Sequence, residues 1–378
     1  MADYVFWLCL LLPAYAYLGY PLMLALIAAF VPVKPTPRGK PLSVSVIIAA
    51  HNEGAHIEQK LRTLLAQDYQ ATDLQIIVAS DGSTDDTVAQ ARTLNDARVV
   101  VLDLPRGGKA SALNAAVAQA DAEVLVFTDA DNQWNEQTLG RLLAPLADPD
   151  VGCVGGHMII PDPGHSLSLG DSLYRHYEAW LRGAENRTGC MVSTDGALLA
   201  LRRELFQPVP AQVNDDFFLS TCAPVAGKRI VYAADAVVLD HGVDEPGKQF
   251  RRRLRVTVGG LQSLAYRRTL LNPLRHGFYS VALISHKLIR RLAPVLLVPL
   301  LLSSIWLEGS GPFYQFFLIA QLTGYAVGLL GLLDTGGNLP KPFRLAAFLL
   351  VTLAGMCGGL WQFLRGHSYE QWNPQQNR

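Results

Sequence analysis

The feature that most constrains this chain is a long segment without charge at its N-terminus. No charged residue occurs from Tyr4 to Val33, and about 20 consecutive apolar residues are enough to cross a bilayer as a helix. A cleaved signal peptide fits poorly, because no basic residue precedes the segment and its apolar part is too long. Only Asp3 precedes the segment, whereas Lys34, Arg38 and Lys40 follow it. We therefore expect a transmembrane helix within residues 1–33 and a cytoplasmic location from residue 34 onward.

The C-terminal region contains similar segments. Gly309–Leu333 and Leu345–Leu364 are free of charge and long enough to span. Leu292–Leu307 is shorter and contains two prolines, so it could be a kinked crossing or a re-entrant segment. We therefore predict two or three transmembrane spans and a tail within residues 292–378. The tail would lie outside if Leu292–Leu307 crosses and in the cytoplasm if it does not, and the positive-inside rule mildly favours the cytoplasm.

Composition agrees with a membrane protein that carries a soluble domain, since 50% of residues are hydrophobic and 17% are charged. The five cysteines are scattered, which predicts a reducing compartment with no disulfide and no zinc site. Residues 248–291 contain eleven Lys or Arg and no Asp or Glu, although the chain balances 32 basic against 32 acidic residues. Such a segment predicts amphipathic interfacial helices on anionic membrane lipids. We predict no nucleic-acid partner.

Residues 34–247 alternate short apolar runs with amphipathic stretches, which is typical of an α/β domain with a mainly parallel sheet. Ligands of such sheets gather at the carboxyl ends of the strands, so polar residues directly after each apolar run are candidates for function. The predicted strands are Ser45–Ala50, Leu74–Ala79, Arg98–Leu102, Glu123–Phe127 and Val151–Gly155.

Polar groups follow four of these strands. Asp129 and Asp131 come after the fourth, and paired carboxylates suit Mg²⁺ or Mn²⁺ bridged to phosphate oxygens. Gly108-Lys109 opens a predicted helix, where backbone N–H groups and one cation can meet a phosphate. Asp81 ends the second strand and could accept a hydrogen bond from a base. A solvated loop at Asp129, an Asx turn at Asp81 and a solvated helix start at Lys109 are the structural alternatives.

Taken in order, these motifs resemble the family 2 glycosyltransferases with the GT-A (Rossmann-like) fold. The resemblance covers about residues 43–260, and it implies inverting transfer of a sugar from a nucleotide-diphosphate sugar, with a UDP-sugar as the expected donor. It also implies that Asp81 binds the base, that Lys109 lies near the donor, and that Asp129 and Asp131 hold metal and diphosphate. His51 stands where the family often has Tyr, and we assign its neighbours Ala50, Asn52 and Glu53 to the donor site. The motifs are Val46–Glu53, Ser80–Asp85, Gly108–Asn114 and Thr128–Asp131.

An inverting transfer needs a base that takes the acceptor proton. Asn214-Asp215-Asp216 resembles the family's Glu-Asp motif, which implies that Asp216 is the base and Asp215 its support. The alternative is a helix N-cap, a role that Asn214 could fill. For the acceptor we select Asp195 and Gly196, because glycine lets a bulky sugar approach the backbone.

Glu178 is a third acceptor candidate, on a predicted helix where a solvent-exposed ion-paired face is the alternative. Gln249-Phe250-Arg251-Arg252-Arg253 resembles the Gln-x-x-Arg-Trp motif of the processive cellulose, chitin and hyaluronan synthases. Gln249 and Arg252 match and imply a diphosphate clamp, whereas Arg253 replaces the Trp that helps support the acceptor. We assign all three to the donor site, and His241 to the metal together with Asp129 and Asp131.

These observations predict a multipass enzyme of the plasma (inner) membrane with a cytoplasmic catalytic domain. It would transfer a sugar to a polysaccharide or a polyprenyl-linked acceptor in exopolysaccharide biosynthesis, in association with other polysaccharide-assembly proteins. The alternative is a processive synthase that polymerises and exports. A non-catalytic sensor of nucleotide sugars would bind donor without turnover. A transporter is disfavoured, because no charged residue lies within the predicted spans.

Overall fold

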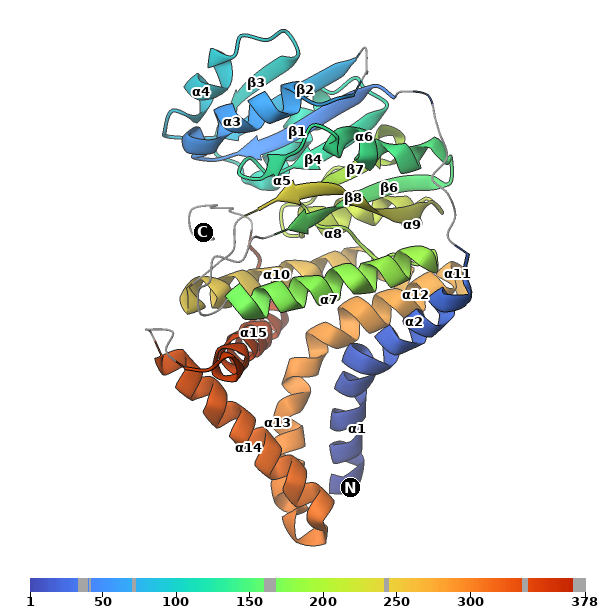
Figure 1. The fold of residues 1–378 in the computed structure, drawn as a ribbon, viewed down its shortest axis with the longest axis vertical. Helices are drawn as coiled ribbons and strands as arrows, with labels where there is room; N and C mark the ends of the chain where they lie inside the picture. The colour runs from blue at the N-terminus through green and yellow to red at the C-terminus, as the bar shows by residue number, and fades with distance from the viewer. Residues whose placement is uncertain are drawn as a thin grey trace.

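The computed structural model describes residues 1–32, 40, 42–69, 73–159, 168–240, 245–334 and 339–369. An α/β domain lies above a layer of two long helices, and this layer rests on a group of apolar helices (Figure 1). The arrangement confirms the expected fold class, a GT-A-like α/β domain with apolar helices from both ends of the chain.

The domain is built on one eight-stranded sheet with the order β3-β2-β1-β4-β7-β6-β8-β5. β1 pairs in parallel with β2 and β4, and β2 pairs in parallel with β3. All five predicted strands are present, whereas β5, β7 and β8 were not expected from the sequence. The strands are β1 (Val44–Ala50), β2 (Leu74–Asp81), β3 (Val99–Leu104), β4 (Val124–Thr128), β5 (Gln133–Trp134), β6 (Val151–Ile159), β7 (Leu199–Arg202) and β8 (Arg229–Leu239).

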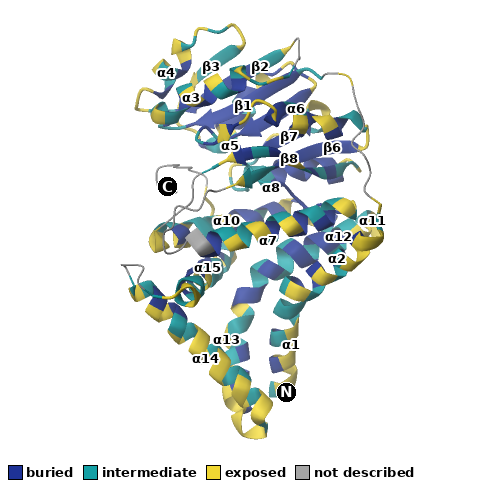
Figure 2. Ribbon diagram, in the orientation of Figure 1, coloured by how far each residue is buried: buried dark blue, intermediate teal, exposed yellow. Residues whose placement is uncertain are grey.

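Every residue of β1 is buried, as its nearly uninterrupted apolar sequence requires of a central parallel strand. Its side chains alternate between two cores. Val46 and Ile48 pack with Ile57 of α3, and Ile47 packs with Leu113 of α5 on the opposite face. The remaining helices of this domain are α3 (Gly54–Leu65), α4 (Thr87–Thr93), α5 (Lys109–Ala118), α6 (Thr138–Leu143), α8 (Asp215–Ser220) and α9 (Cys222–Val225). The sheet is the most deeply buried part of the protein (Figure 2).

The layer below the sheet consists of α7 (Ser168–Arg187) and α10 (Pro246–Tyr266), with the short α11 (Pro273–His276) after it. Helix α15 (Lys341–Leu364) packs against α10 through two glycines. A Cβ atom at Gly355 would lie 2.8 Å from the Cβ of Arg253, and one at Gly359 would lie 2.7 Å from the Cβ of Thr257. The two backbones therefore approach too closely for larger residues at these positions.

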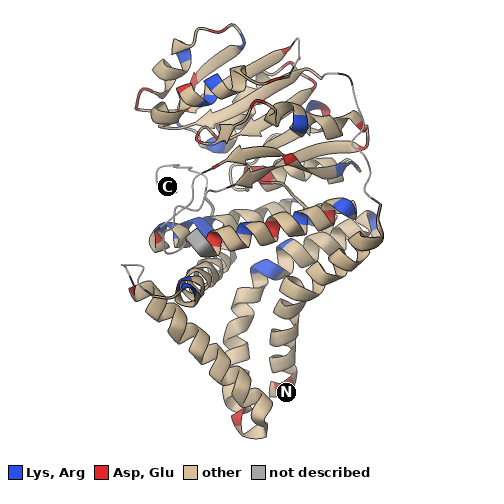
Figure 3. Ribbon diagram, in the orientation of Figure 1, with Lys and Arg blue, Asp and Glu red and all other residues tan. Residues whose placement is uncertain are grey.

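Four helices in the described part of the chain are long and apolar enough to cross a membrane: Ala2–Phe30, Phe278–Trp306, α14 (Pro312–Leu333) and α15. The first comprises α1 (Ala2–Ala14), a π-helical turn (Tyr15–Gly19) and α2 (Tyr20–Phe30). The second comprises α12 (Phe278–Leu283), a π-helical segment (Ile284–Ile289) and α13 (Arg290–Trp306). The parts of these helices that lie farthest from the sheet carry almost no charged residues, whereas charged residues gather on the α7 and α10 layer and on the sheet (Figure 3).

Two expectations about the C-terminal region need revision. The segment Leu292–Leu307 is not an isolated short crossing, because it continues a helix that begins at Phe278. The expected border between residues 248–291 and 292–378 therefore falls inside a helix. In addition, Arg267 and Arg290 of the basic stretch are buried in the protein rather than spread over a membrane surface.

The tail lies on the same side as the α/β domain. Gln262 of α10 donates a hydrogen bond from Nε2 to the carbonyl oxygen of His367, at 3.1 Å, and Tyr369 lines a small cavity with Lys109 and Asp215. Phe278–Trp306 is long enough to cross a membrane, and the tail nevertheless lies on the side of the α/β domain. The reason is that α14 returns to the layer and α15 lies beneath α10 (Figure 1).

Candidate active site

Lys109 joins three elements at the carboxyl edge of the sheet. Its ammonium lies 3.0 Å from Asp129 Oδ1 at the end of β4 and 2.9 Å from Asp215 Oδ2 at the start of α8. Burial alone would lower the pKa of Lys109, but the two carboxylates raise it above its ordinary value. The first residue of α5 is therefore a fixed cation between two acids that lie far apart in the sequence.

The adjacent acids Asp215 and Asp216 have different environments. Burial acts to raise the pKa of Asp215, but the Lys109 ammonium lowers it below its ordinary value. Burial and the neighbouring charge of Asp215 raise the pKa of Asp216 to about 6. A carboxyl group with such a pKa can hold and release a proton near neutral pH, as a general base must. Asp215 thus favours its charged form, whereas Asp216 can exchange a proton near neutral pH.

The alternative role of this motif as a helix cap is only partly realised. Asn214 precedes α8, but its side chain makes no capping hydrogen bond. Its Nδ2 instead donates to the carbonyl oxygen of Val256 on α10, at 3.1 Å. Asp216 accepts a hydrogen bond from the N–H of Phe217, at 2.7 Å. Asn214 therefore links α8 to α10 and holds the two acids against the helix layer.

A cavity of about 370 Å³ runs from Lys109 and Asp129 past Asp216 to Tyr17 and Arg291 of the apolar helices. It brings together most of the polar residues that the sequence selected, from both the sheet and the helix layer. The predicted site residues that line it are Lys109, Asp129, Glu178, Asp195, Gly196, Asp215, Asp216, Arg252 and Arg253.

The remaining predicted residues lie elsewhere. The carboxylate of Asp81 accepts hydrogen bonds from the N–H groups of Gly107 and Gly108, at 2.6 and 2.9 Å, and from Arg106 at 2.8 Å. Asp81 therefore fixes the loop that leads into α5, and its contact with a base stays a prediction. The others that do not line the cavity are Ala50, Asn52, Glu53, Asp131 and Gln249.

Asn52 and Glu53, just after β1, lie in a turn that contacts the segment after β2. Asn52 has a positive φ of 55°, and its Oδ1 accepts a hydrogen bond from the N–H of Thr84, at 2.8 Å. Glu53 is buried, and its N–H donates to Thr87 Oγ1 at 2.8 Å. This turn is held by polar contacts of its own, so its role in donor binding also stays a prediction.

The residues Gln249, Arg252 and Arg253 lie in three different environments. Gln249 is buried, and neither polar atom of its amide has a hydrogen-bond partner among the residues that the structure describes, as would suit a group that binds a ligand. Arg252 lines the cavity, and burial lowers its pKa to about 10. Arg253 lies 3.7 Å from Asp171 Oδ1, and its guanidinium stacks 4.7 Å above the ring of Tyr174. Arg253 is thus engaged with α7, although it also lines the cavity.

The acceptor candidates also differ from one another. Asp195 forms a two-pronged ion pair with Arg182, and the Arg182 Nη2 to Asp195 Oδ1 distance is 2.5 Å. This pair holds the loop of Gly196, where an added Cβ would lie 3.4 Å from the Cβ of Asp216. Glu178 lies 2.6 Å from Arg290 Nη2. It belongs to an ion-paired face, as the alternative interpretation held, but that face is buried rather than solvent-exposed.

The metal assignment rests on Asp129 and Asp131. The described residues contain no group of three or more His, Cys, Asp or Glu side chains that could hold an ion. Two carboxylates nevertheless fit Mg²⁺, which commonly takes one or two protein carboxylates and completes its shell with substrate phosphates and water. Burial raises the pKa of Asp129 and the neighbouring charge of Asp131 adds to that shift, whereas the Lys109 ammonium opposes it. His241 lies outside the described residues.

Lys60 is a residue at this edge that sequence reasoning missed. It is buried under β4, and its ammonium donates to Thr128 Oγ1 at 2.9 Å and to the carbonyl oxygen of Asn132 at 3.2 Å. Burial lowers its pKa to about 7, although the charges of Asp129 and Asp131 oppose that shift. The sequence carried a signal, because Lys60 shares the spacing of Ile57, Leu61 and Leu64 on the buried face of α3.

Comparison with known proteins agrees with this geometry. Residues 45–206 match the family described as glycosyl transferase family 2. The chain is therefore similar to the family 2 glycosyltransferases over fewer than half of its residues. It is 27% identical over 209 residues to an uncharacterized glycosyltransferase of Nostoc sp., covering 50% of this chain and 61% of that protein. It is 27% identical over 237 residues to an N-acetylglucosaminyltransferase of Rhizobium meliloti, covering 56% and 54%.

A hyaluronan synthase of Streptococcus pyogenes is 28% identical over 224 residues, with coverage of 53% of each chain. The chain thus spans 53 to 61% of the length of these three relatives. Among solved structures, the mannosyltransferase of Pyrobaculum calidifontis in complex with GDP-Man and Mn²⁺ superposes with a TM-score of 0.72 at 24% identity. That match covers 97% of this chain and 100% of the other, so the likeness of fold includes the apolar helices.

Proposed function

We propose that this protein is an inverting, metal-dependent glycosyltransferase of the plasma (inner) membrane, with its catalytic domain in the cytoplasm. It would transfer a sugar from a nucleotide-diphosphate sugar, with a UDP-sugar as the expected donor, to a lipid-linked or polysaccharide acceptor in exopolysaccharide biosynthesis. The observation that carries this proposal is the position of Asp216. This carboxyl group has a pKa of about 6 and lines the same cavity as Lys109 and Asp129.

In the proposed reaction, Asp216 accepts the proton of the acceptor hydroxyl group as its oxygen bonds to the anomeric carbon. The bond from that carbon to the diphosphate breaks, and the nucleoside diphosphate leaves with the electron pair. Lys109 and Arg252 line the cavity on the donor side and supply positive charge for the diphosphate. Asp215 keeps Lys109 in place.

A divalent cation, Mg²⁺ or Mn²⁺, would be held by Asp129 and Asp131. When bound, it would neutralise charge on the departing diphosphate. The solved mannosyltransferase of similar fold was crystallised with Mn²⁺ and GDP-Man, which supports a divalent ion and a nucleotide sugar here without selecting the metal or the base. The hyaluronan synthase and the N-acetylglucosaminyltransferase among the relatives support an acceptor that is a glycan.

Transfer of a single sugar is the favoured version of this function. Where the processive synthases have Trp, this chain has Arg253, which binds Asp171 and stacks on Tyr174 of α7. The Trp ring that could support a growing glycan is therefore replaced by a cation, and this cation links α10 to α7. A ladder of long polymer made by purified protein from donor alone would instead support the processive alternative.

The test is to incubate membranes that contain the full chain and their own acceptors with a panel of nucleotide sugars, and to measure the nucleotide released. We expect one donor to stand out, and release to stop when EDTA removes divalent ions and to return with Mg²⁺ or Mn²⁺. Asp131→Ala should abolish metal-dependent donor binding, because one carboxylate is a poor bridge between cation and diphosphate. Asp121→Ala, at an exposed acid on the same domain, is the matched control. Donor affinity that is unchanged in Asp131→Ala would refute the metal assignment.

A further inference from the structure

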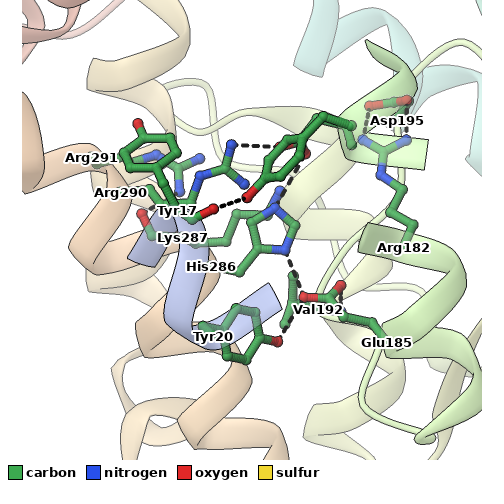
Figure 4. A network of polar contacts seen from close by, with 12 residues as sticks. Tyr17, Tyr20, Arg182, Glu185, Val192, Asp195, His286, Lys287, Arg290 and Arg291 are labelled. Atoms are coloured by element: carbon green, nitrogen blue, oxygen red, sulfur yellow. Dashed lines mark hydrogen bonds and ion pairs between the residues drawn. The ribbon is translucent and has the colours of Figure 1, made fainter. Parts of the chain in front are cut away.

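The membrane-side end of the cavity is formed by residues from three separate parts of the chain. Tyr17 comes from the N-terminal apolar helix, Glu178 and Arg182 come from α7, and Lys287 and Arg291 come from the helix Phe278–Trp306. Figure 4 shows Tyr17, Lys287 and Arg291 on one side of His286 and the Arg182–Asp195 pair on the other. This end of the cavity is distinct from the donor side, which Lys109 and Asp129 line.

The carboxylates at this end already have basic partners. Glu178 Oε1 forms an ion pair with Arg290 Nη2 at 2.6 Å, and Glu178 Oε2 faces His286 Nε2 at 3.2 Å. Glu185 lies 2.7 Å from His286 Nδ1 and accepts from the hydroxyl of Tyr20 at 2.9 Å. Both imidazole nitrogens of His286 thus face carboxylates. Among the described residues, no ion pair joins either carboxylate to Lys287 or Arg291, although the charge of Glu178 reaches both at longer range.

Two cations are left over. Lys287 makes no side-chain hydrogen bond or ion pair with any residue that the structure describes. Within the described ranges, the one hydrogen bond of the Arg291 side chain goes to the carbonyl oxygen of Lys287, at 3.0 Å. Its guanidinium lies directly against Gly260 of α10, where a side chain would displace it. Lys287 and Arg291 are one helical turn apart and line the same cavity, so their charges are presented together.

An excess of positive charge in a largely buried cavity is costly unless a counter-ion arrives. Arg and Lys together are a common binding pair for phosphate, Arg through its planar fork and Lys as a point charge. A neutral glycan would bring no such charge. The cavity is also lined by Tyr17 and by the helix Phe278–Trp306, both parts of candidate membrane spans. The missing anion therefore belongs to a molecule that can reach the cavity from the membrane.

We propose that Lys287 and Arg291 bind the phosphate of a phosphate-bearing lipid acceptor, whose sugar hydroxyl group then faces Asp216. This inference rests on the proposed transferase function and narrows its acceptor to a lipid phosphate or diphosphate that carries a sugar. The lipid chain lies among the apolar helices, and the sugar occupies the cavity between Arg291 and Asp216. The donor phosphates are held separately, at Lys109 and Arg252.

The experiment measures binding of farnesyl diphosphate to the purified full chain in detergent micelles, with farnesol and inorganic diphosphate as separate arms. The double variant Lys287→Gln/Arg291→Gln should bind farnesyl diphosphate about tenfold to hundredfold more weakly, because it lacks two charge-assisted contacts. Lys287→Arg should retain binding, and so should Arg275→Gln, which removes an exposed charge of the same basic stretch. Farnesol and inorganic diphosphate should each bind more weakly than the complete lipid.

Wild-type affinity in the double variant would overturn the proposal. Equal affinity for inorganic diphosphate would overturn the lipid as the source of the phosphate, and equal affinity for farnesol would overturn the phosphate contact. Thermal unfolding of each variant, together with single Lys287→Gln, separates lost binding from lost folding. Nucleotide release from a panel of nucleotide sugars is measured in parallel in membranes that contain the wild type and their own acceptors. If the wild type releases none from any nucleotide sugar, the transferase function fails, whereas the lipid-binding result stands on its own.

Discussion

The catalytic edge of the sheet and the polar cluster beneath it are built in different ways. At the edge, Asp129, Lys109 and Asp215 meet as the ends of short segments, and each belongs to a recognisable local motif. In the cluster, which we define as Tyr20, Glu178, Glu185, His286 and Arg290, single residues come from helices far apart in the sequence. Motifs thus set the chemistry at the edge, while long-range pairs determine how the domain sits on the apolar helices.

The two regions also differ in access to solvent. The side chains of Asp129 and Asp215 are 32% and 27% exposed, as a site that must admit a donor requires. Glu185 and His286 are 0% and 2% exposed. A change at the edge should therefore affect turnover more than stability, and a change in the cluster should affect stability more than the chemical step.

The largest effect is expected at Asp216. Asp216→Asn keeps the size of the side chain but removes the base, so turnover should fall by about 10²- to 10⁴-fold, while donor binding and thermal unfolding change little. Nucleotide release in the presence of acceptor measures this, with Asp121→Asn as the exposed control. Turnover within a few-fold of wild type would exclude Asp216 as the base. Turnover of the wild type that disappears in this variant would exclude a non-catalytic sensor.

The second prediction concerns the cluster. Glu185→Ala leaves His286 and Tyr20 without their shared acceptor, and breaking a buried ion pair costs about 3–5 kcal/mol. The control is Glu58→Ala, which breaks an exposed pair with Arg62 and should cost about 0.3–0.5 kcal/mol. Denaturant unfolding of both variants in the same detergent measures the difference. Equal stability of the two variants would show that the cluster does not fasten the domain to the apolar helices.

The third prediction concerns pH. Since only the ionised form of Asp216 is a base and its pKa is about 6, kcat/KM should fall about tenfold per unit below pH 6 and level off above it. The raised pKa also means that the folded state binds this proton more tightly than the unfolded chain. The stability that Asp216 contributes is therefore present below about pH 4 and lost as pH rises through 6. An acidic limb that persists in Asp216→Asn would assign it to another group.

The same contrast explains what could be predicted from sequence. The parallel strands and the groups after them were predictable, because one apolar run and its next few residues fix each of them. Lys109 was therefore found before its contacts were known, whereas Asp215 and Asp216 were found through the resemblance of Asn214–Asp216 to the Glu-Asp motif of the family 2 glycosyltransferases. The cluster was not, since nothing local to His286 specifies Glu178 or Glu185, and Arg290 was assigned to a membrane surface although it is buried against Glu178.

Errors at the ends of the chain have a related cause. Leu292–Leu307 was judged by its own length, but packing extends the helix back to Phe278, across a π-helical segment that carries His286 and Lys287. The side on which the tail lies depends on α15 beneath α10, a contact between helices separated in sequence. Hydropathy identifies an apolar helix but does not say what it packs against.

The prediction with the smallest expected effect concerns the contact between α10 and α15, where the two regions join. Helix α10 carries Arg252 into the cavity, yet it packs on α15 through Gly359, where an added Cβ would lie 2.8 Å from the carbonyl oxygen of Leu254. Backbone atoms cannot move aside cheaply, so Gly359→Ala should cost about 1–3 kcal/mol. Gly183→Ala on α7 is the control, because a Cβ there meets no atom within 4 Å and should stabilise that helix by about 0.5–1 kcal/mol. Unfolding measures both. If Gly359→Ala also raises KM for the donor, α15 helps to position the edge through Arg252; if stability falls with KM unchanged, the two regions are independent at this contact.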